Sequence, residues 1–233
     1  MSSADANQRT ALIVGASRGL GHALTEELWS RGWRVIATRR GAAPLLQALA
    51  AQSAGEIEVQ CIDIASRVDL QKLDEALSGR ELDLLFVNAG ISLSKQDTAL
   101  SAGDADFIEM MMTNAFLPMR VAETLDHLVQ PNGTIAFMSS ELASIADNQG
   151  VCDLYAASKA ALNMLVKCYA ARRPHDSRGT LLIAPGWVRT GTGGPDALLS
   201  VEESIPLVAS LLEANLGTPG LRFVDRFNQT ISW

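Results

Sequence analysis

The sequence predicts one α/β domain in which a mostly parallel, doubly wound sheet of seven strands carries helices on both faces. Short runs of β-branched and aliphatic residues alternate with longer segments of helical pattern along almost the whole chain. The strand candidates are four to six residues long, and helices between such strands supply the right-handed crossovers that parallel strands require. A chain of 233 residues is sufficient for one domain of this kind.

The predicted elements follow one another in a regular order. Strands are expected at residues 11–14, 34–38, 57–62, 82–87, 134–138, 180–184 and 221–224. Helices are expected between them, at residues 19–31, 43–52, 66–78, 104–129, 154–173 and 201–214. Within the single domain 1–233, residues 1–9 are expected to be disordered. The Gly-rich residues 186–200 are expected to form a lid over the substrate.

The charge balance excludes several classes of protein. The 19 Lys and Arg residues against 26 Asp and Glu residues give a net charge of −7, with no long basic cluster. Nucleic-acid binding is not expected, because neutralisation of phosphates dominates that affinity. Hydrophobic residues make up 48% of the chain, which excludes a disordered protein. No apolar run approaches the ~20 residues of a membrane span, and residues 1–9 do not form a signal peptide, so no membrane association is expected.

The use of cysteine and histidine predicts a cytoplasmic protein without a metal site. The three Cys are scattered and form no CxxC pair, and the three His form no HExxH motif. Disulfide frameworks and zinc sites need closer or paired spacing.

A glycine-rich turn follows the first predicted strand. It comprises Gly15-Ala-Ser-Arg-Gly-Leu-Gly21, and a predicted helix begins within it. Such glycines let the backbone approach a pyrophosphate, and the helix N-terminus presents free N–H groups to the anion. Any tight strand-to-helix turn can use Gly, but the strand before and the helix after this turn favour a dinucleotide site.

Two arginines mark the expected ribose site. At the end of the second strand, where an NAD-binding enzyme of this architecture carries Asp or Glu, the chain has Thr38 followed by Arg39. Arg18 lies in the glycine-rich turn. Guanidinium groups suit a 2′-phosphate, which a carboxylate would repel, so the pattern predicts NADP(H). The alternative for each Arg is a solvated surface charge.

Tyr155 and Lys159 are a candidate acid–base pair at the start of a predicted helix. Residues four apart lie on one helix face, so the phenol and the ammonium can point into one cleft. The cation is expected to lower the pKa of Tyr155 toward working pH, as general acid–base catalysis of carbonyl reduction needs. Ser139 and Ser140 end the fifth strand and offer hydroxyls to a carbonyl oxygen. Pro118 lacks an N–H for the carbonyl of Asn114 and predicts a kink in its helix.

The glycine spacing GxxxGxG and the Tyr-Ala-Ala-Ser-Lys motif resemble the short-chain dehydrogenase/reductase family over the whole chain, which implies a Rossmann-type fold. Val14 departs from the Thr that the family has before its glycines. The resemblance implies that Ser140 binds the carbonyl oxygen, although the 15 positions from Ser140 to Tyr155 exceed the family's usual interval and keep Ser139 as a minor alternative. It also implies a relay water at Asn114. The implied catalytic tetrad is Asn114, Ser140, Tyr155 and Lys159.

The same resemblance implies a set of cofactor contacts. Asp63 and Ile64 would contact the adenine, and the segment Pro185–Thr190 would position the nicotinamide carboxamide. The cofactor-binding residues implied are Gly15, Ser17, Arg18, Gly19, Leu20, Gly21, Arg39, Asp63, Ile64, Asn88, Ala89, Gly90, Tyr155, Lys159, Pro185, Gly186, Val188 and Thr190.

The C-terminal third resembles the C-factor-like branch of the family, which includes the sniffer-type carbonyl reductases. Gly193-Gly-Pro195 and the terminal Trp233 carry this resemblance, whereas Asn228 and Ser232 replace the Gly and Pro of the branch. A mostly apolar pocket is expected, which suits a small apolar or aromatic carbonyl substrate. Its expected lining is Glu141, Leu142, Ala143, Ile145, Cys152, Trp187, Thr192 and Leu198.

These features predict an oxidoreductase that transfers hydride between NADP(H) and a carbonyl or secondary alcohol. The alternative is a C-factor-like signalling or NAD(P)-sensing protein with little or no turnover, against which the complete tetrad argues. The resemblance also implies a homodimer or homotetramer formed through the helices expected at 104–129 and 154–173.

Overall fold

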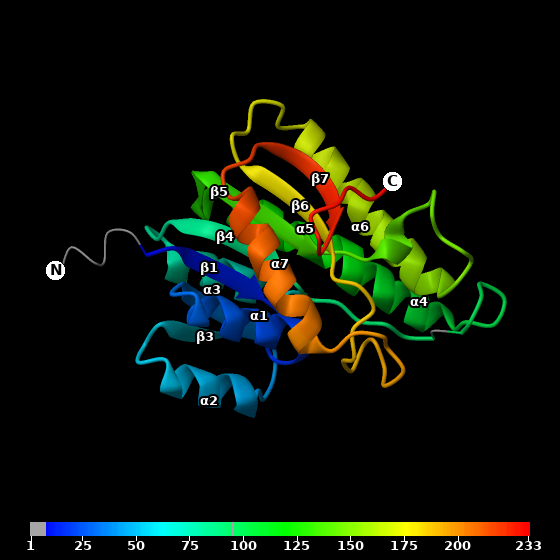
Figure 1. Cartoon of the computed structure of the whole chain (residues 1–233), viewed down its shortest axis with the longest axis horizontal. Helices are drawn as coiled ribbons and strands as arrows, with labels where there is room; N and C mark the ends of the chain where they lie inside the picture. The colour runs from blue at the N-terminus through cyan, green and yellow to red at the C-terminus, as the bar shows by residue number, and fades with distance from the viewer. Residues whose placement is uncertain (1–7, 95) are drawn as a thin grey trace.

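A single parallel sheet of seven strands forms the centre of the structure, a computed structural model that describes residues 8–94 and 96–233 (Figure 1). The strands are β1 Thr10–Val14, β2 Arg34–Arg39, β3 Ile57–Cys61, β4 Leu82–Val87, β5 Val129–Met138, β6 Gly179–Ala184 and β7 Gly220–Asp225. Their order is β3-β2-β1-β4-β5-β6-β7, with every neighbouring pair parallel. The winding direction reverses between β1 and β4, which is where ligands bind in such sheets. This topology confirms the predicted Rossmann-type fold.

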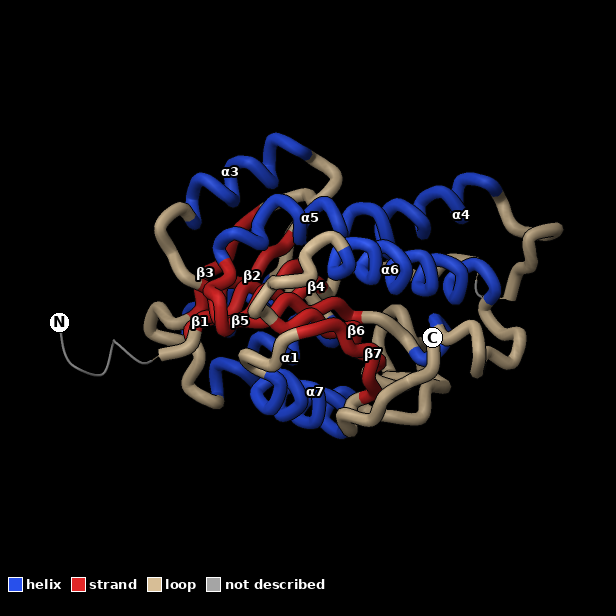
Figure 2. Tube along the Cα trace, turned by 90° about the horizontal axis from the view of Figure 1, so that it is seen from above, coloured by secondary structure: helices blue, strands red, loops and turns tan. Residues whose placement is uncertain are grey.

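Helices cover both faces of the sheet. Figure 2 shows α3, α5 and α6 on one side of the sheet and α1 and α7 on the other. The helices are α1 Gly19–Ser30, α2 Pro44–Gln52, α3 Arg67–Leu77, α4 Asp104–Met111, α5 Leu117–Leu125, α6 Asp153–Ala171 and α7 Val201–Asn215. None of the described helices combines the length and the apolar composition of a membrane span.

The core consists of two apolar layers, one on each face of the sheet. Leu12 and Val14 of β1 belong to the layer packed against α3, α5 and α6, whereas Ala11 and Ile13 face α1, α2 and α7. This alternation follows from the two-residue period of a strand, and it buries both faces of the sheet.

Residues 1–7, most of the segment predicted to be disordered, lie outside the described residues. The two residues that follow them are in contact with the domain. Gln8 donates a hydrogen bond of 2.8 Å to Glu56, and the guanidinium of Arg9 lies 5.5 Å from the centre of the Trp33 ring.

The helix predicted at 104–129 is interrupted at the position of the predicted kink. A π-helical turn, Met112–Phe116, separates α4 from α5. The N–H of Leu117 donates to the carbonyl five residues earlier, and Pro118 has no N–H with which to continue the α-helical ladder. The kink therefore takes the form of a π turn, and Asn114 lies at its centre.

The prediction that this helix continues to residue 129 is wrong. Asp126–Leu128 form a single 3-10 turn, and Val129 already belongs to β5. Val129 pairs with Leu82 of β4, and the register shifts before Leu84. Strand pairing prevails because Val is β-branched and because a helix could not continue through the nearby Pro131.

Two neighbouring leucines of α2 provide a matched test of core packing. Leu46 is fully buried, whereas Leu45 is 67% exposed. We expect Leu46→Ala to lower the free energy of unfolding by about 2–5 kcal/mol, because it deletes buried methyl groups and leaves a cavity. Leu45→Ala should change it by less than about 0.5 kcal/mol. Denaturant titration followed by circular dichroism checks both values, and equal losses would contradict the assigned core.

Candidate active site

The glycine-rich turn between β1 and α1 is packed too closely for side chains at two of its glycines. Gly15 has φ +92°, and a Cβ there would lie 2.9 Å from the backbone of Ala89. A Cβ at Gly21 would lie 2.2 Å from the carbonyl oxygen of Gly15 and 2.5 Å from Nδ2 of Asn88. The turn therefore lies directly against the loop that follows β4, as a shallow cradle for a pyrophosphate requires. Ser17 and Leu20 lie within the same turn, partly buried.

The end of β2 is bonded to this turn. The N–H of Gly15 donates to the hydroxyl of Thr38 at 3.0 Å, and the N–H of Ala16 donates to the carbonyl of Thr38 at 2.8 Å. Thr38 is buried, so its side chain is a structural brace of the turn. The residue that replaces an acidic ribose ligand thus stabilises the turn.

Arg39 and Arg18 both lie at the carboxyl edge of the sheet, next to that brace. Arg18 is the exposed N-cap residue of α1. Nη1 of Arg39 donates to the carbonyl of Gly41 at 2.7 Å and lies 3.5 Å from Sγ of Cys61. Nε of Arg39 is buried and has no hydrogen-bond partner among the described residues. A guanidinium with an unused donor fits an additional acceptor such as a phosphate.

Asp63 and Ile64 follow β3 at the same edge. One carboxylate oxygen of Asp63 accepts the N–H of Ala65 at 2.9 Å, and the N–H of Asp63 donates to Asp69 at 3.0 Å. These bonds fix the turn into α3. Ile64 is partly buried and packs against the core.

The loop Asn88–Gly90 lies between the glycine-rich turn and the predicted catalytic residues. Nδ2 of Asn88 donates to the carbonyl of Gly15 at 2.8 Å. A Cβ at Gly90 would lie 3.3 Å from Oδ1 of Asn114 and 3.3 Å from Nζ of Lys159. Only the backbone of this loop therefore separates the glycine-rich turn from Asn114 and Lys159.

Asn114 is fully buried and uses both ends of its carboxamide. Oδ1 accepts the N–H of Ile91 at 2.7 Å, and Nδ2 donates to the carbonyl of Ile91 at 2.8 Å and to Oγ of Ser158 at 2.9 Å. Ser158 was not among the predicted site residues. Its position directly before Lys159 in the sequence could have indicated that it lies at the site.

Lys159 projects from α6 into the interior. It is 3% exposed, and its Nζ donates to the carbonyl of Met138 at 2.8 Å. Burial lowers the pKa of Lys159 to about 8. The ammonium lies 5.9 Å from the centre of the Tyr155 ring, one helical turn earlier on the same face.

The pKa of Tyr155 is raised rather than lowered in this structure. Burial raises it to about 12, the hydrogen bond with Ser140 lowers it, and the nearby Cys152 raises it. The prediction that this pKa would be lowered is therefore wrong for the protein without ligands. Desolvation of the phenolate outweighs the contacts that favour it.

The two serines at the end of β5 have different partners. Ser139 is buried, and its hydroxyl donates to Oδ1 of Asn163 at 2.7 Å. Ser140 is bonded to Tyr155 and accepts the N–H of Leu142 at 3.2 Å. Of the two hydroxyls, that of Ser140 is the one beside the phenol.

The segment after β6 folds back on itself. The N–H of Leu199 donates to the carbonyl of Trp187 at 3.0 Å, and the N–H of Arg189 donates to the carbonyl of Leu199 at 2.9 Å. Val188 is buried within this segment, and Pro185 and Gly186 lead into it. Thr190 approaches the glycine turn, because a Cβ at Gly19 would lie 3.7 Å from its side chain. The cofactor residues predicted from both segments are thus brought together.

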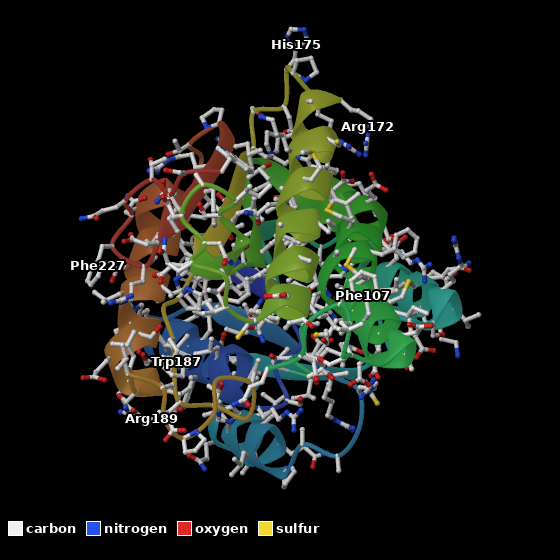
Figure 3. All side chains as sticks on the ribbon, turned by 90° about the vertical axis from the view of Figure 1, so that its right-hand side faces the viewer. Phe107, Arg172, His175, Trp187, Arg189 and Phe227 are labelled. Atoms are coloured by element: carbon white, nitrogen blue, oxygen red, sulfur yellow. The ribbon has the colours of Figure 1, made fainter. Side chains whose placement is uncertain are left out.

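A cavity of about 340 Å³ lies beside the 3-10 turn that follows Ser140. Its lining includes the predicted Glu141 and Leu142 but none of Cys152, Trp187, Thr192 and Leu198. The indole N–H of Trp187 instead donates to Gly193 at 2.9 Å, and Leu198 is 77% exposed. Figure 3 shows Trp187 and Arg189 at the surface, within the segment predicted to form a lid.

Five of the residues that line this cavity were not among the predicted pocket residues. The residues missed are Asp147, Asn148, Gln149, Val151 and Ile231. The first four could have been found from their position between Ser140 and Tyr155. Ile231 could not, because only packing of the C-terminal segment brings it there.

Comparison with known proteins agrees with this arrangement. Residues 9–196 match the family model described as short chain dehydrogenase. The chain belongs to the short-chain dehydrogenase family. Within the described residues of this family member, no group of three or more His, Cys, Asp or Glu side chains could hold a metal ion.

Other members of the short-chain dehydrogenase family resemble this chain over most of its length. A structure described as a short-chain dehydrogenase/reductase of Burkholderia multivorans with bound NADP is 45% identical, covers 97% of this chain and 100% of its own, and has a TM-score of 0.94. A carbonyl reductase of Pseudomonas aeruginosa PAO1 in complex with NADP is 38% identical, with the same coverage and a TM-score of 0.89. The C-signal protein of Myxococcus xanthus is 31% identical over 158 residues, which are 65% of this chain and 93% of that protein.

The close contact at Gly21 predicts the effect of adding one methyl group to the cradle. Gly21→Ala should displace the turn and weaken dinucleotide binding by about tenfold or more, equivalent to about 1.4 kcal/mol. Gly103→Ala is the control, because nothing lies within 4 Å of a Cβ at that position. Fluorescence titration with the dinucleotide checks both variants. Unchanged affinity in Gly21→Ala would contradict the assignment of the cradle.

Proposed function

We propose that this protein is an NADP(H)-dependent oxidoreductase that transfers hydride between the nicotinamide and a carbonyl or secondary alcohol of a small apolar or aromatic substrate. The observation that carries the proposal is the convergence of Asn114, Ser140, Tyr155 and Lys159 beside the glycine turn. The bound dinucleotide would supply or accept the hydride. The chain itself would supply the proton and hold the carbonyl oxygen.

Tyr155 is the proton donor in this scheme. With a pKa of about 12, its phenol is protonated at neutral pH. The hydroxyl of Ser140, bonded to Tyr155, would bind the same carbonyl oxygen as negative charge develops on it. The proton passes from the phenol to that oxygen, and the phenolate left behind has to be stabilised.

Lys159 is the group placed to stabilise it. At pH 7 its ammonium is largely protonated, since its pKa is about 8. One N–H is used by the carbonyl of Met138, which leaves donors for a ribose hydroxyl. The carbonyl of Asn114, which Pro118 cannot satisfy, is proposed to hold the water that returns the proton through Lys159.

NADP(H) is the cofactor that the ribose site supports best. Thr38 is buried in place of an acid, and Arg18 and Arg39 flank the site. The Burkholderia multivorans and Pseudomonas aeruginosa structures contain NADP, which supports the same choice. A signalling role is the second candidate, favoured by the similarity to C-signal. The intact set of proton-transfer residues favours the enzyme.

We also propose that the protein forms a dimer or tetramer and is located in the cytoplasm. Large apolar side chains are exposed on α4 and α6, among them Phe107, Ile108 and Met164. The two helices are in contact with each other, and exposed apolar side chains on them would suit a dimer or tetramer. Cys61, Cys152 and Cys168 are free thiols, which supports a cytoplasmic location.

The two tyrosines of the chain allow a matched test of the proton donor. Tyr155→Phe should lower kcat for carbonyl reduction by about 10²–10⁴-fold, because the acid is removed. Binding of NADPH, measured by fluorescence, should remain within about threefold of the original value. Tyr169 lies near the other end of α6, and Tyr169→Phe loses only the 2.7 Å hydrogen bond from its hydroxyl to Asp126. This variant should keep its kcat. Full turnover in Tyr155→Phe would refute the catalytic assignment.

Adjacent arginines test the cofactor preference. Arg39→Ala should lower kcat/KM for NADPH by about 10–100-fold, because a charge-assisted bond to the 2′-phosphate is lost. The value for NADH should change little. The exposed Arg40, mutated to Ala, is the control. An equal loss with both cofactors would contradict the 2′-phosphate contact.

A further inference from the structure

Arg226 is a cation at the carboxyl edge of the sheet that the catalytic scheme does not use. It follows Asp225, the last residue of β7. Ser140 follows β5 and Gly186 follows β6, so the three residues stand at the ends of three adjacent parallel strands. Ligands of doubly wound folds lie at this edge. Figure 3 shows Phe227, the neighbour of Arg226, on the same side of the molecule as Trp187.

The guanidinium of Arg226 reaches between two segments of the site. Its Nη1 lies 4.0 Å from Oε1 of Glu141, the residue after Ser140. A Cβ at Gly186 would lie 2.6 Å from the same nitrogen. The absence of a side chain at Gly186 therefore makes room for the guanidinium next to the segment predicted to hold the nicotinamide.

The donors of this guanidinium are unused. The side chain is only 18% exposed, yet residues 8–94 and 96–233 place no acceptor within hydrogen-bonding distance, because Glu141 is too far away. The ring of Phe227, 4.3 Å from Cζ, holds the guanidinium without taking up any N–H. Its nitrogens remain accessible to solvent, so an acceptor of a ligand can reach them and replace water there.

We propose that Arg226 binds a carboxylate of the substrate, so that the protein prefers carbonyl compounds that carry an acid group. This inference rests on the proposed carbonyl reduction and specifies the class of substrate. The planar guanidinium offers two parallel N–H donors that match the two oxygens of a carboxylate. The carbonyl would lie at Ser140 and Tyr155, and the acid group would lie on the side of Gly186.

Three carboxylates of the protein lie near this site, and two of them are engaged elsewhere. Asp225 accepts the N–H groups of Phe227 and Gln229 at 2.9 and 2.8 Å. Asp147 accepts a bond from Ser144 and lines the neighbouring cavity. Glu141 is 55% exposed and can turn into solvent when a substrate carboxylate replaces it. Glu141 is thus the competitor for Arg226, and its neutralisation should strengthen the preference for acids.

Matched pairs of aldehydes test the proposal. The probes are 3-formylbenzoate and 4-formylbenzoate, each compared with its methyl ester, with NADPH as the reductant. In the unmodified protein, kcat/KM should be higher for at least one acid than for its ester. Arg226→Gln should lower kcat/KM for that acid by about 10–100-fold and leave the ester unchanged. Glu141→Gln should raise the ratio of acid to ester.

The outcomes distinguish the substrate class from the function itself. A preference of the unmodified protein for both esters, or an equal loss on acid and ester in Arg226→Gln, would overturn the carboxylate site and leave carbonyl reduction intact. Failure to reduce any of the four aldehydes would count against the proposed function. If Arg226→Gln does not fold, Arg226→Lys is used instead, because it keeps the charge but loses the planar fork and should lower the ratio of acid to ester.

Discussion

The carboxamide of Asn114 is the interaction on which the geometry of the site depends. It bonds to both backbone groups of Ile91, just after the loop that follows β4, and to the hydroxyl of Ser158 on α6. One buried side chain thereby fixes the π turn, the segment that follows β4 and the helix of Tyr155 and Lys159 relative to one another. Because every polar atom of this buried amide has a partner, the three segments have little freedom to shift independently.

Close backbone approach is the second constraint, and glycine meets it. The turn at Gly15 and Gly21 packs on the loop of Asn88, and Gly90 lies against both Asn114 and Lys159. A side chain at any of these positions would push apart the segments that meet there. The spacing of glycines in the sequence thus indicates where loops pack closely together, as well as where a phosphate could bind.

Much of this arrangement could be predicted from the sequence, because the site is built from strand ends. In a parallel sheet, residues that follow successive strands meet at one edge, so Gly15, Arg39, Asn88, Ser140 and Gly186 could be grouped before their contacts were known. Properties that depend on tertiary packing could not be predicted. The pKa of Tyr155 depends on how deeply α6 buries the phenol, and the sequence shows only that a lysine lies one turn away.

The same limit explains the other differences. Val129 has the pattern of a helix end, but pairing with β4 makes it part of a strand. The lining of the cavity includes Ile231 from the far end of the chain, and the guanidinium of Arg226 reaches Glu141 across 85 positions, from 226 − 141. Such contacts depend on where the last strand lies in the sheet, which no local pattern reveals.

The N-terminus of α1 differs from those of α3 and α7 in having no cap of its own. Ser66 and Ser200 accept backbone N–H groups at the starts of α3 and α7, whereas Arg18 makes no such bond and α1 has no acidic residue in its first turn. The free donors of α1 are left for an anion to satisfy, so binding and folding are thermodynamically linked at this helix. A ligand present at a hundred times its dissociation constant adds about 2.7 kcal/mol to the stability of the folded chain. The concentration of the dinucleotide would then set the fraction of the protein that stays folded, as well as the rate of catalysis.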